Sequence, residues 1–280
     1  MNFIREPAVS GMFYPGNPKT LKRDIERYLG DAVFDPIAGN IVGIISPHAG
    51  YMYSGPVAAY GYKAIAGRTY DTVIVIAPSH RKYFEGAAVI EKGGYKTPLG
   101  IVEVDEETAG MILKKSTAVH SNIDAHKEEH SLEVQIPFLQ MVLKDFKLVP
   151  LIMGSQDFST CEALSAGIYE AIKDSGKQIL IVGSTDLSHY YSYAHAVEFD
   201  SIVTKRLDDF DVKGLVTDLG KDKCEACGAG PMITIMTLSR KSGAKQSKVL
   251  KYANSGDVSG DKSAVVGYVS AIFYNKYEGK

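Results

Sequence analysis

Three apolar runs in this chain are each followed closely by a histidine: residues 41–46 precede His48, residues 72–77 precede His80, and residues 178–184 precede His189. Short continuous runs rich in β-branched residues are typical of strands buried on both faces of a parallel sheet. Because ligands bind beyond the carboxyl ends of such strands, we expect the three imidazoles to share one crevice. Together they favour a metal site, although each one singly is also explained as a structural histidine.

A second group of polar residues lies between residues 128 and 139. Apolar residues recur there at helical spacing, and His130 and Glu133, three residues apart, would share another face of the same helix. We expect Pro137 to kink or restart this helix. Such a pair is more often a surface hydrogen bond than a functional site, so we place both residues only around the pocket.

The chain has three cysteines, and two of them form a C-x-x-C pair, Cys224 and Cys227. No second pair of cysteines or histidines accompanies them at the spacing of a zinc ribbon, and an odd number argues against a disulfide framework. Cys227 precedes a helix expected to begin at Pro231, whose free amides would stabilise a thiolate that could bind metal. The alternative is two small buried thiols in a tight loop. Cys161 is expected in the core.

Strand-like and helix-like segments alternate along the chain, which predicts an α/β fold with a central, mostly parallel or mixed sheet flanked by helices in three layers. We treat residues 1–280 as one domain. Besides the three runs above, strands are expected at 87–91, 101–104, 147–153, 247–253 and 264–274. Helices are expected at 56–66, 106–115, 158–174, 194–209, 212–219 and 231–241, with Asp105 and Asp157 as N-caps.

Composition excludes several classes of function. Hydrophobic residues make up 45% of the chain and the formal net charge is -2, so no basic face is available to attract nucleic acid. No apolar stretch is long enough to span a bilayer. The first residues lack the charged and then apolar pattern of a secretory signal, so we expect a cytosolic protein that acts away from membranes.

Five motifs in a fixed order carry a resemblance to a known family. They are Pro47-His48-Ala49-Gly50-Tyr51, Pro78-Ser79-His80, Glu129-His130-Ser131-Leu132-Glu133, Asp186-Leu187-Ser188-His189 and Cys227-Gly228. This series resembles the Memo family (mediator of cell motility), which includes the microbial proteins called AmmeMemoRadiSam system protein B. The arginine-led start at residues 5–15 and the segment 252–257 are also similar, so that the resemblance spans nearly the whole chain.

The resemblance implies a fold like that of the class III extradiol ring-cleavage dioxygenases, in which two histidines and a glutamate hold non-haem iron. It implies that His48 and His80 bind the metal, that Cys227 replaces the glutamate, and that His189 is the acid/base histidine. Asp186 would orient or polarise the site. A soft thiolate in place of a carboxylate favours Fe(II), Cu or Zn over hard cations.

Considered without the resemblance, two imidazoles and a thiolate would leave positions on the metal for water, O2 or substrate. Asp186 would fix the tautomer of His189 if the two side chains meet, so that His189 can move a proton. Tyr51 and Tyr53, in the loop after His48, are natural pocket walls, although aromatic residues in such loops are as often packing residues.

Three functions follow as hypotheses. The first is a metal-dependent oxidoreductase related to the extradiol dioxygenases, with Fe(II) as the first choice of metal and with a substrate that the sequence does not identify. The second is a non-enzymatic protein that holds a metal ion or a peptide in the same cavity. The third is a zinc hydrolase, which rests on the open metal position alone. The ligand is then a small molecule or a peptide, and an oligomer is compatible with the sequence.

Overall fold

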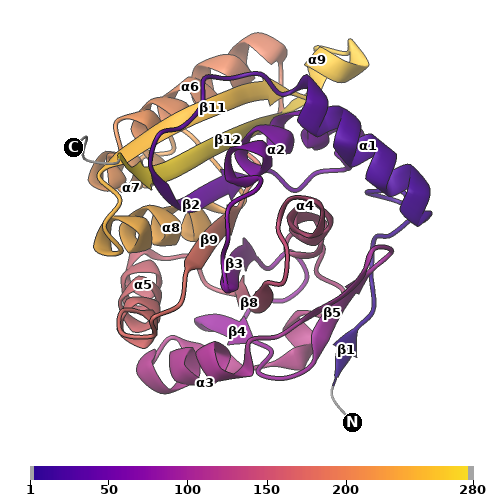
Figure 1. Cartoon of the computed structure of the whole chain (residues 1–280). Helices are drawn as coiled ribbons and strands as arrows, with labels where there is room; N and C mark the ends of the chain where they lie inside the picture. Colours follow the sequence, from indigo (N-terminus) through magenta and orange to yellow (C-terminus); the bar gives the residue numbers. More distant parts are fainter. Residues whose placement is uncertain (1–2, 277–280) are drawn as a thin grey trace.

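The computed structural model describes residues 3–276 (Figure 1). Met1, Asn2 and residues 277–280 of the predicted domain lie outside the described residues. The strands are β1 (Ile4–Arg5), β2 (Asn40–Ser46), β3 (Thr72–Pro78), β4 (Ala87–Val89), β5 (Gly94–Thr97), β6 (Gly100–Glu103), β7 (Val119–Ser121), β8 (Lys147–Met153), β9 (Ile179–Ser184), β10 (His189–Tyr191), β11 (Gln246–Asn254) and β12 (Val265–Asn275). The α-helices are α1 (Pro18–Asp31), α2 (Tyr51–Ile65), α3 (Glu106–Lys115), α4 (Ile136–Val142), α5 (Phe158–Ile172), α6 (Tyr193–Asp208), α7 (Val212–Leu219), α8 (Ala229–Lys241) and α9 (Gly256–Ser259), and two 3-10 turns are η1 (Ile123–Ala125) and η2 (Glu133–Gln135).

The central sheet of the described residues has nine strands, in the order β10-β12-β2-β9-β3-β8-β4-β7, with β11 paired to β12. Its middle strands β2, β9, β3 and β8 run parallel, whereas β12 is antiparallel to β2 and β4 is antiparallel to β8. The middle strands are buried along almost their whole length, as their continuous apolar sequences predict. A smaller sheet has the order β1-β5-β6.

Helices cover both faces of the central sheet (Figure 1). Helices α3 and α8 pack on the middle strands, and α5 packs against both of them. Helix α6 continues this layer over β11 and β12, and α7 packs against α6 and α8. Helices α1, α2 and α4 form the layer on the other face. The expected α/β class, with a mixed central sheet flanked by helices, is therefore confirmed. Within residues 3–276, the helices are all too short or too polar to cross a bilayer.

Most expected elements are present within a few residues of their expected bounds, but α2 begins earlier than expected. The sequence predicts a helix that starts near Pro56, and the structure starts it at Tyr51 with Pro56 inside. The amide of Tyr51 donates to the carbonyl of Phe13, and the Tyr51 ring packs against Tyr14 and Phe138. Tertiary packing of Tyr51 thus outweighs the local preference of proline for a first helical turn.

The helix expected over residues 128–139 is shorter than expected. His130 lies in a loop, Glu133 lies in the 3-10 turn η2, and α4 begins only at Ile136, with Pro137 in its first turn. The sequence predicts that Pro137 either kinks or restarts the helix, and the structure shows that it restarts the helix. His130 and Glu133 consequently do not share a helix face, and their side chains point to different partners.

Asp105, the expected N-cap of α3, joins that helix to the amino-terminal ends of β3 and β9. Its carboxylate accepts hydrogen bonds from the amide of Thr108 at 3.0 Å, from the hydroxyl of Thr72, and from Nζ of Lys177 at 2.9 Å. Burial opposes the ionisation of Asp105, but these hydrogen bonds together hold its pKa at about 2. The cap therefore also stabilises the fold electrostatically.

Asp105→Asn should remove a stabilising contribution that depends on pH. The folded pKa lies below the unfolded value, so the contribution is present above about pH 4 and is lost as the pH falls toward 2. We expect the variant to lose up to about 2 kcal/mol of unfolding free energy at pH 7, and less at pH 3. Urea unfolding at both pH values tests this, since Asn keeps the capping oxygen. If the variant and the wild type differed in unfolding free energy by the same amount at pH 7 and at pH 3, this expectation would be contradicted.

Candidate metal centre

The central strands bring the three predicted histidine loops to one edge of the sheet. Strands β2, β9 and β3 are parallel neighbours, so their carboxyl ends lie side by side. His48 follows β2, His80 follows β3, and His189 follows β9 at the start of β10. The three loops therefore follow parallel strands that end at the same edge, as expected. His189, however, is not among the residues whose ligand atoms lie close together.

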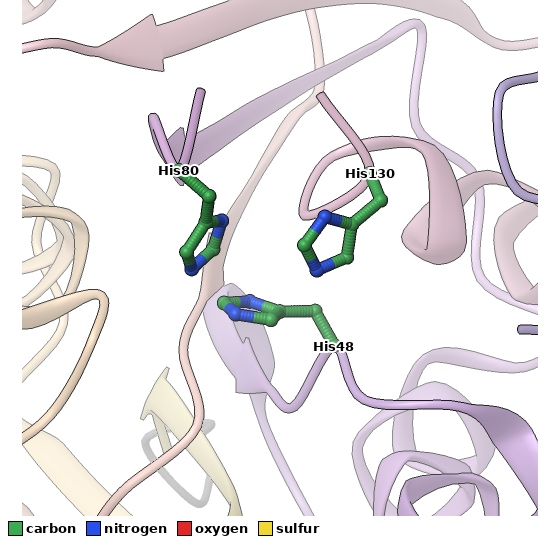
Figure 2. A group of neighbouring side chains, drawn as sticks. All are labelled: His48, His80 and His130. Carbon is green, nitrogen blue, oxygen red and sulfur yellow. The ribbon is translucent and has the colours of Figure 1, made fainter. Parts of the chain in front are cut away.

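A cluster of three histidines lies at this edge, and its third member is His130 (Figure 2). The ligand atoms of His48, His80 and His130 all lie within 4.8 Å of one another. The ring centroids are 5.1 Å apart for His48 and His80, 5.7 Å for His48 and His130, and 4.9 Å for His80 and His130. Figure 2 shows the three rings turned toward a common centre, an arrangement that could hold a metal ion.

The cluster is buried on one side and open on the other. His48 is 2% exposed, whereas the side chains of His130 and His80 are 15% and 30% exposed. Burial lowers the pKa of His48 well below its ordinary value, and the neighbouring His80 and His130 add to this effect. Burial likewise lowers the pKa of His130 to about 4. Both rings are therefore neutral at neutral pH, which is the form of histidine that binds metals.

Glu129 contacts the Nδ1 atoms of the two more exposed histidines, His80 and His130. Its oxygen Oε1 lies 3.0 Å from Nδ1 of His80 and 3.4 Å from Nδ1 of His130, and the His80 amide donates to Oε2 at 2.5 Å. Burial opposes its ionisation, but hydrogen bonds from His80 and from the Ser131 amide hold its pKa at about 2. A carboxylate that accepts from Nδ1 leaves Nε2 of His80 free, as in many histidine ligands of metals.

Cys227 lies beside the cluster but is not one of the three mutually close residues. Its Sγ is 3.1 Å from Nε2 of His48 and 3.3 Å from the amide of Asp186. The expectation that the loop before α8 stabilises a thiolate is wrong for the free side chain, since burial raises the pKa of Cys227 and Asp186 adds to the rise. The amides of Asp186 and Gly228 lower that pKa too little to compensate.

Asp186 and His189 do not act as the pair that the sequence suggested. The Asp186 carboxylate accepts from the backbone amide of His48 at 2.7 Å, and Nδ1 of His189 donates to the carbonyl of Leu187 at 2.8 Å. No hydrogen bond joins the two side chains among the described residues. Asp186 therefore holds the His48 loop, and burial raises its pKa to about 7 against the lowering effect of the His48 and Ala49 amides.

Two residues expected around the pocket belong to the protein core instead. Glu133 accepts from Arg5, from the Tyr14 hydroxyl and from the amides of residues 8 and 9, so that it anchors the amino-terminal segment. Tyr51 is buried, and its hydroxyl donates to the carbonyl of Val134 at 2.6 Å. Tyr53 is half-buried. Cys161 and Cys224 are buried, and burial raises the pKa of each thiol to about 11.

Sequence reasoning missed the residues that support the cluster, namely Glu129, Ser184, Gln135 and Arg5. Glu129 stands next to His130 in the sequence, but helical spacing drew attention to Glu133 instead. Ser184 is the last residue of β9, and that position at the carboxyl end of a central strand is a signal that could have identified it. Nothing in the spacing of Arg5 or Gln135 connects them with the histidines.

Gly228 sets the position of Cys227. A Cβ atom added to Gly228 would overlap the carbonyl oxygen of Ser184 and lie 2.7 Å from Cβ of Thr185, so that the loop would have to move. We expect Gly228→Ala to lose about 1–3 kcal/mol of unfolding free energy and to displace the sulfur from His48. Gly110→Ala is the control, because an added Cβ in α3 meets no atom within 4 Å. Equal stability of the two variants would contradict this expectation.

Comparisons with known proteins agree with the motifs. A family model described as Memo-like protein matches residues 5–272. A MEMO1 family protein of Sulfolobus acidocaldarius is 39% identical over 96% of this chain and 99% of its own length. A MEMO1 family protein of Methanosarcina mazei is 40% identical over 96% and 98%, and one of Methanobrevibacter smithii is 39% identical over 96% and 99%. The crystal structure of an uncharacterized Escherichia coli K12 protein, 14% identical, covers 82% of this chain and 99% of its own with a TM-score of 0.48, too weak a likeness to inform the fold.

Proposed function

This chain belongs to the Memo-like protein family, and from that premise we propose that its three clustered histidines bind a transition-metal ion. The observation that carries the proposal is the mutual distance of their ligand atoms, all within 4.8 Å, at the edge of the sheet where ligands bind. Structural histidines seldom meet with ring nitrogens facing one another in this way, because nitrogens that face one another are poorly supplied with hydrogen-bond donors and acceptors.

The residues present fit such an ion. The Nδ1 atoms of His48 and His80 are engaged with Ser184 and Glu129, so that their Nε2 atoms are available. Imidazole nitrogens suit iron, copper and zinc, and a nearby sulfur favours these ions over magnesium or calcium. We propose His48, His80 and His130 as the nitrogen ligands and Cys227 as a fourth donor on the His48 side, with Fe(II) as the first choice of metal.

The proposed donor set is tested with Co(II), which reports its ligands by absorption. We expect Co(II) to bind the anaerobically purified protein and to give a sulfur-to-metal charge-transfer band that Cys227→Ser lacks, while His130→Ala binds Co(II) more weakly. Cys161→Ser is the control, since the Cys161 sulfur is buried against the carbonyl oxygens of Gln156 and Gly230 and is not part of the histidine cluster. A band that survives in Cys227→Ser would remove the sulfur from the donor set. Unchanged affinity in His130→Ala would remove that histidine.

We further propose that the protein is a redox enzyme in which His189 moves a proton. When bound, an Fe(II) or Cu ion would supply the capacity to activate O2. Nδ1 of His189 donates to the carbonyl of Leu187, which leaves Nε2 as the nitrogen that exchanges a proton. The charge of His189 contributes to the lowered pKa of His48, which supports a role for this ring at the same site.

Oxygen uptake separates this enzyme from a protein that only binds metal. Fe(II)-loaded protein should consume O2 in the presence of a phenolic or thiol compound, and His189→Gln should slow the uptake while it leaves the affinity for Co(II) unchanged. His195→Gln is the matched control, since that histidine is exposed on α6. No uptake with Fe(II) or Cu across a broad panel of compounds would favour the non-enzymatic alternative.

A further inference from the structure

The hydroxyl of Ser184 has three hydrogen-bond partners, and their chemistry determines where its proton lies. Ser184 is fully buried at the end of β9. Its Oγ lies 2.8 Å from Nδ1 of His48, 2.8 Å from Nε2 of Gln135 and 2.6 Å from the carbonyl oxygen of Ser131. A hydroxyl donates one hydrogen bond and accepts two, so this set of partners uses its full capacity.

The orientation of the Gln135 amide is fixed by its other contacts. Its Nε2 lies 3.0 Å from the carbonyl oxygen of Pro47, which can only accept, and its Oε1 accepts from the Tyr62 hydroxyl at 2.6 Å. A flipped amide would place two acceptors against each other at Pro47. Gln135 therefore donates to Ser184, and one of the two lone pairs of the hydroxyl is occupied.

The Ser131 carbonyl then receives the only proton of the hydroxyl. Without that proton, two acceptor oxygens would face each other at 2.6 Å in a buried place, which is costly. The second lone pair of Ser184 is left for His48, so Nδ1 of His48 must carry a hydrogen and donate it. Nε2 of His48 consequently has a free lone pair, and this nitrogen is the one that lies 3.1 Å from Cys227.

We propose that Ser184, oriented by Gln135, is a positioning residue that holds His48 in the tautomer with its proton on Nδ1 and its Nε2 directed at the metal. This inference rests on the proposed metal site and adds to it the reason why the buried ring presents one particular nitrogen. Glu129 does the same for His80 with a carboxylate. The cluster thus has a charged support on its exposed side and a neutral support on its buried side.

A neutral support suits the buried ring. A second carboxylate behind His48 would be an additional buried charge and would raise the histidine's affinity for protons as well as for metal. Ser184 and Gln135 instead fix the tautomer with neutral groups, each of which has its own partners within the core. His48 then remains neutral without a metal and is still oriented to bind one.

The tautomer is measured directly by long-range ¹H–¹⁵N correlation NMR on protein labelled at histidine and free of metal. We expect the wild type to carry the His48 proton on Nδ1, and Ser184→Ala to show a mixture of tautomers or the other tautomer. Ser270→Ala is the matched control, because Ser270 is also fully buried and its hydroxyl has no hydrogen-bond partner among residues 3–276. It should leave the His48 signals as in the wild type.

The affinity for Co(II) is the second readout. Removal of a group that orients a metal ligand typically weakens binding by about 10–100-fold, and we expect that loss in Ser184→Ala, partial recovery in Ser184→Thr, and none in Ser270→Ala. A wild-type spectrum with the proton on Nε2 overturns the inference whatever the variants do. So does a Ser184→Ala protein that keeps both the tautomer and the affinity. If the wild type has the expected tautomer but binds no Co(II), the proposed function fails and the tautomer assignment stands.

Discussion

His48→Ala and His80→Ala should each weaken the binding of Co(II) by more than about 100-fold, a larger loss than that expected for any residue that only orients a ligand. Each substitution removes one of the nitrogen atoms that lie within 4.8 Å of the others. Isothermal titration or equilibrium dialysis under anaerobic conditions measures the affinity. His195→Ala is the control, since it removes an exposed histidine from α6.

His48→Ala and His80→Ala should differ in stability, although both should bind the metal weakly. His48 is 2% exposed, so its removal leaves a cavity and frees Ser184 from its partner, whereas the His80 side chain is 30% exposed. His80→Ala should therefore keep most of the unfolding free energy of the metal-free protein. A His80→Ala protein that is folded by circular dichroism and binds Co(II) as the wild type does would contradict the assignment of His80.

Arg5→Ala should lower the unfolding free energy by about 3–5 kcal/mol, because it leaves buried acceptors without their charged donor. Arg5 is 1% exposed and forms an ion pair with the buried Glu133. It also donates to the carbonyl oxygen of His126 at 3.0 Å and to that of Glu129 at 2.6 Å. Urea unfolding of metal-free protein measures the loss.

The same substitution should weaken metal binding, since Arg5 holds the loop that carries Glu129 and His130. Arg23→Ala is the matched control, because the Arg23 guanidinium is exposed and, among residues 3–276, pairs only with its neighbour Asp24, so that little change is expected. Arg5→Met combined with Glu133→Gln should be more stable than Arg5→Ala, as it leaves no buried charge unpaired. If Arg5→Ala were as stable as the wild type, the buried ion pair would make no net contribution to the unfolding free energy, and this prediction would be wrong.

The fold could be predicted from the sequence wherever local pattern and tertiary structure agree. The buried runs before His48 and His80 became β2 and β3, and Asp105 caps α3 as its position indicates. The start of α2 and the loop around His130 could not be predicted, because they depend on packing. Tyr51 is drawn into the helix by contacts with Tyr14 and Phe138, which are distant in the sequence.

Two residues of the candidate site, His48 and His80, could also be predicted from local pattern. Strand ends locate His48 and His80, because parallel strands deliver their last residues to one edge. His130 reaches the same place from a loop held by Arg5, and no periodicity reveals a loop that is fixed by a residue more than a hundred positions away. The expected partnership of Asp186 with His189 failed because a backbone amide, that of His48, binds the carboxylate instead.

Elemental analysis of protein that has been reconstituted anaerobically with Fe(II) and then desalted tests the central claim most directly. The wild type should retain about one iron per chain, and the variant with His48, His80 and His130 all replaced by alanine should retain almost none while it keeps its helical circular dichroism signal. Equal iron in both proteins, or no iron in the wild type, would contradict a metal ion held by the three histidines.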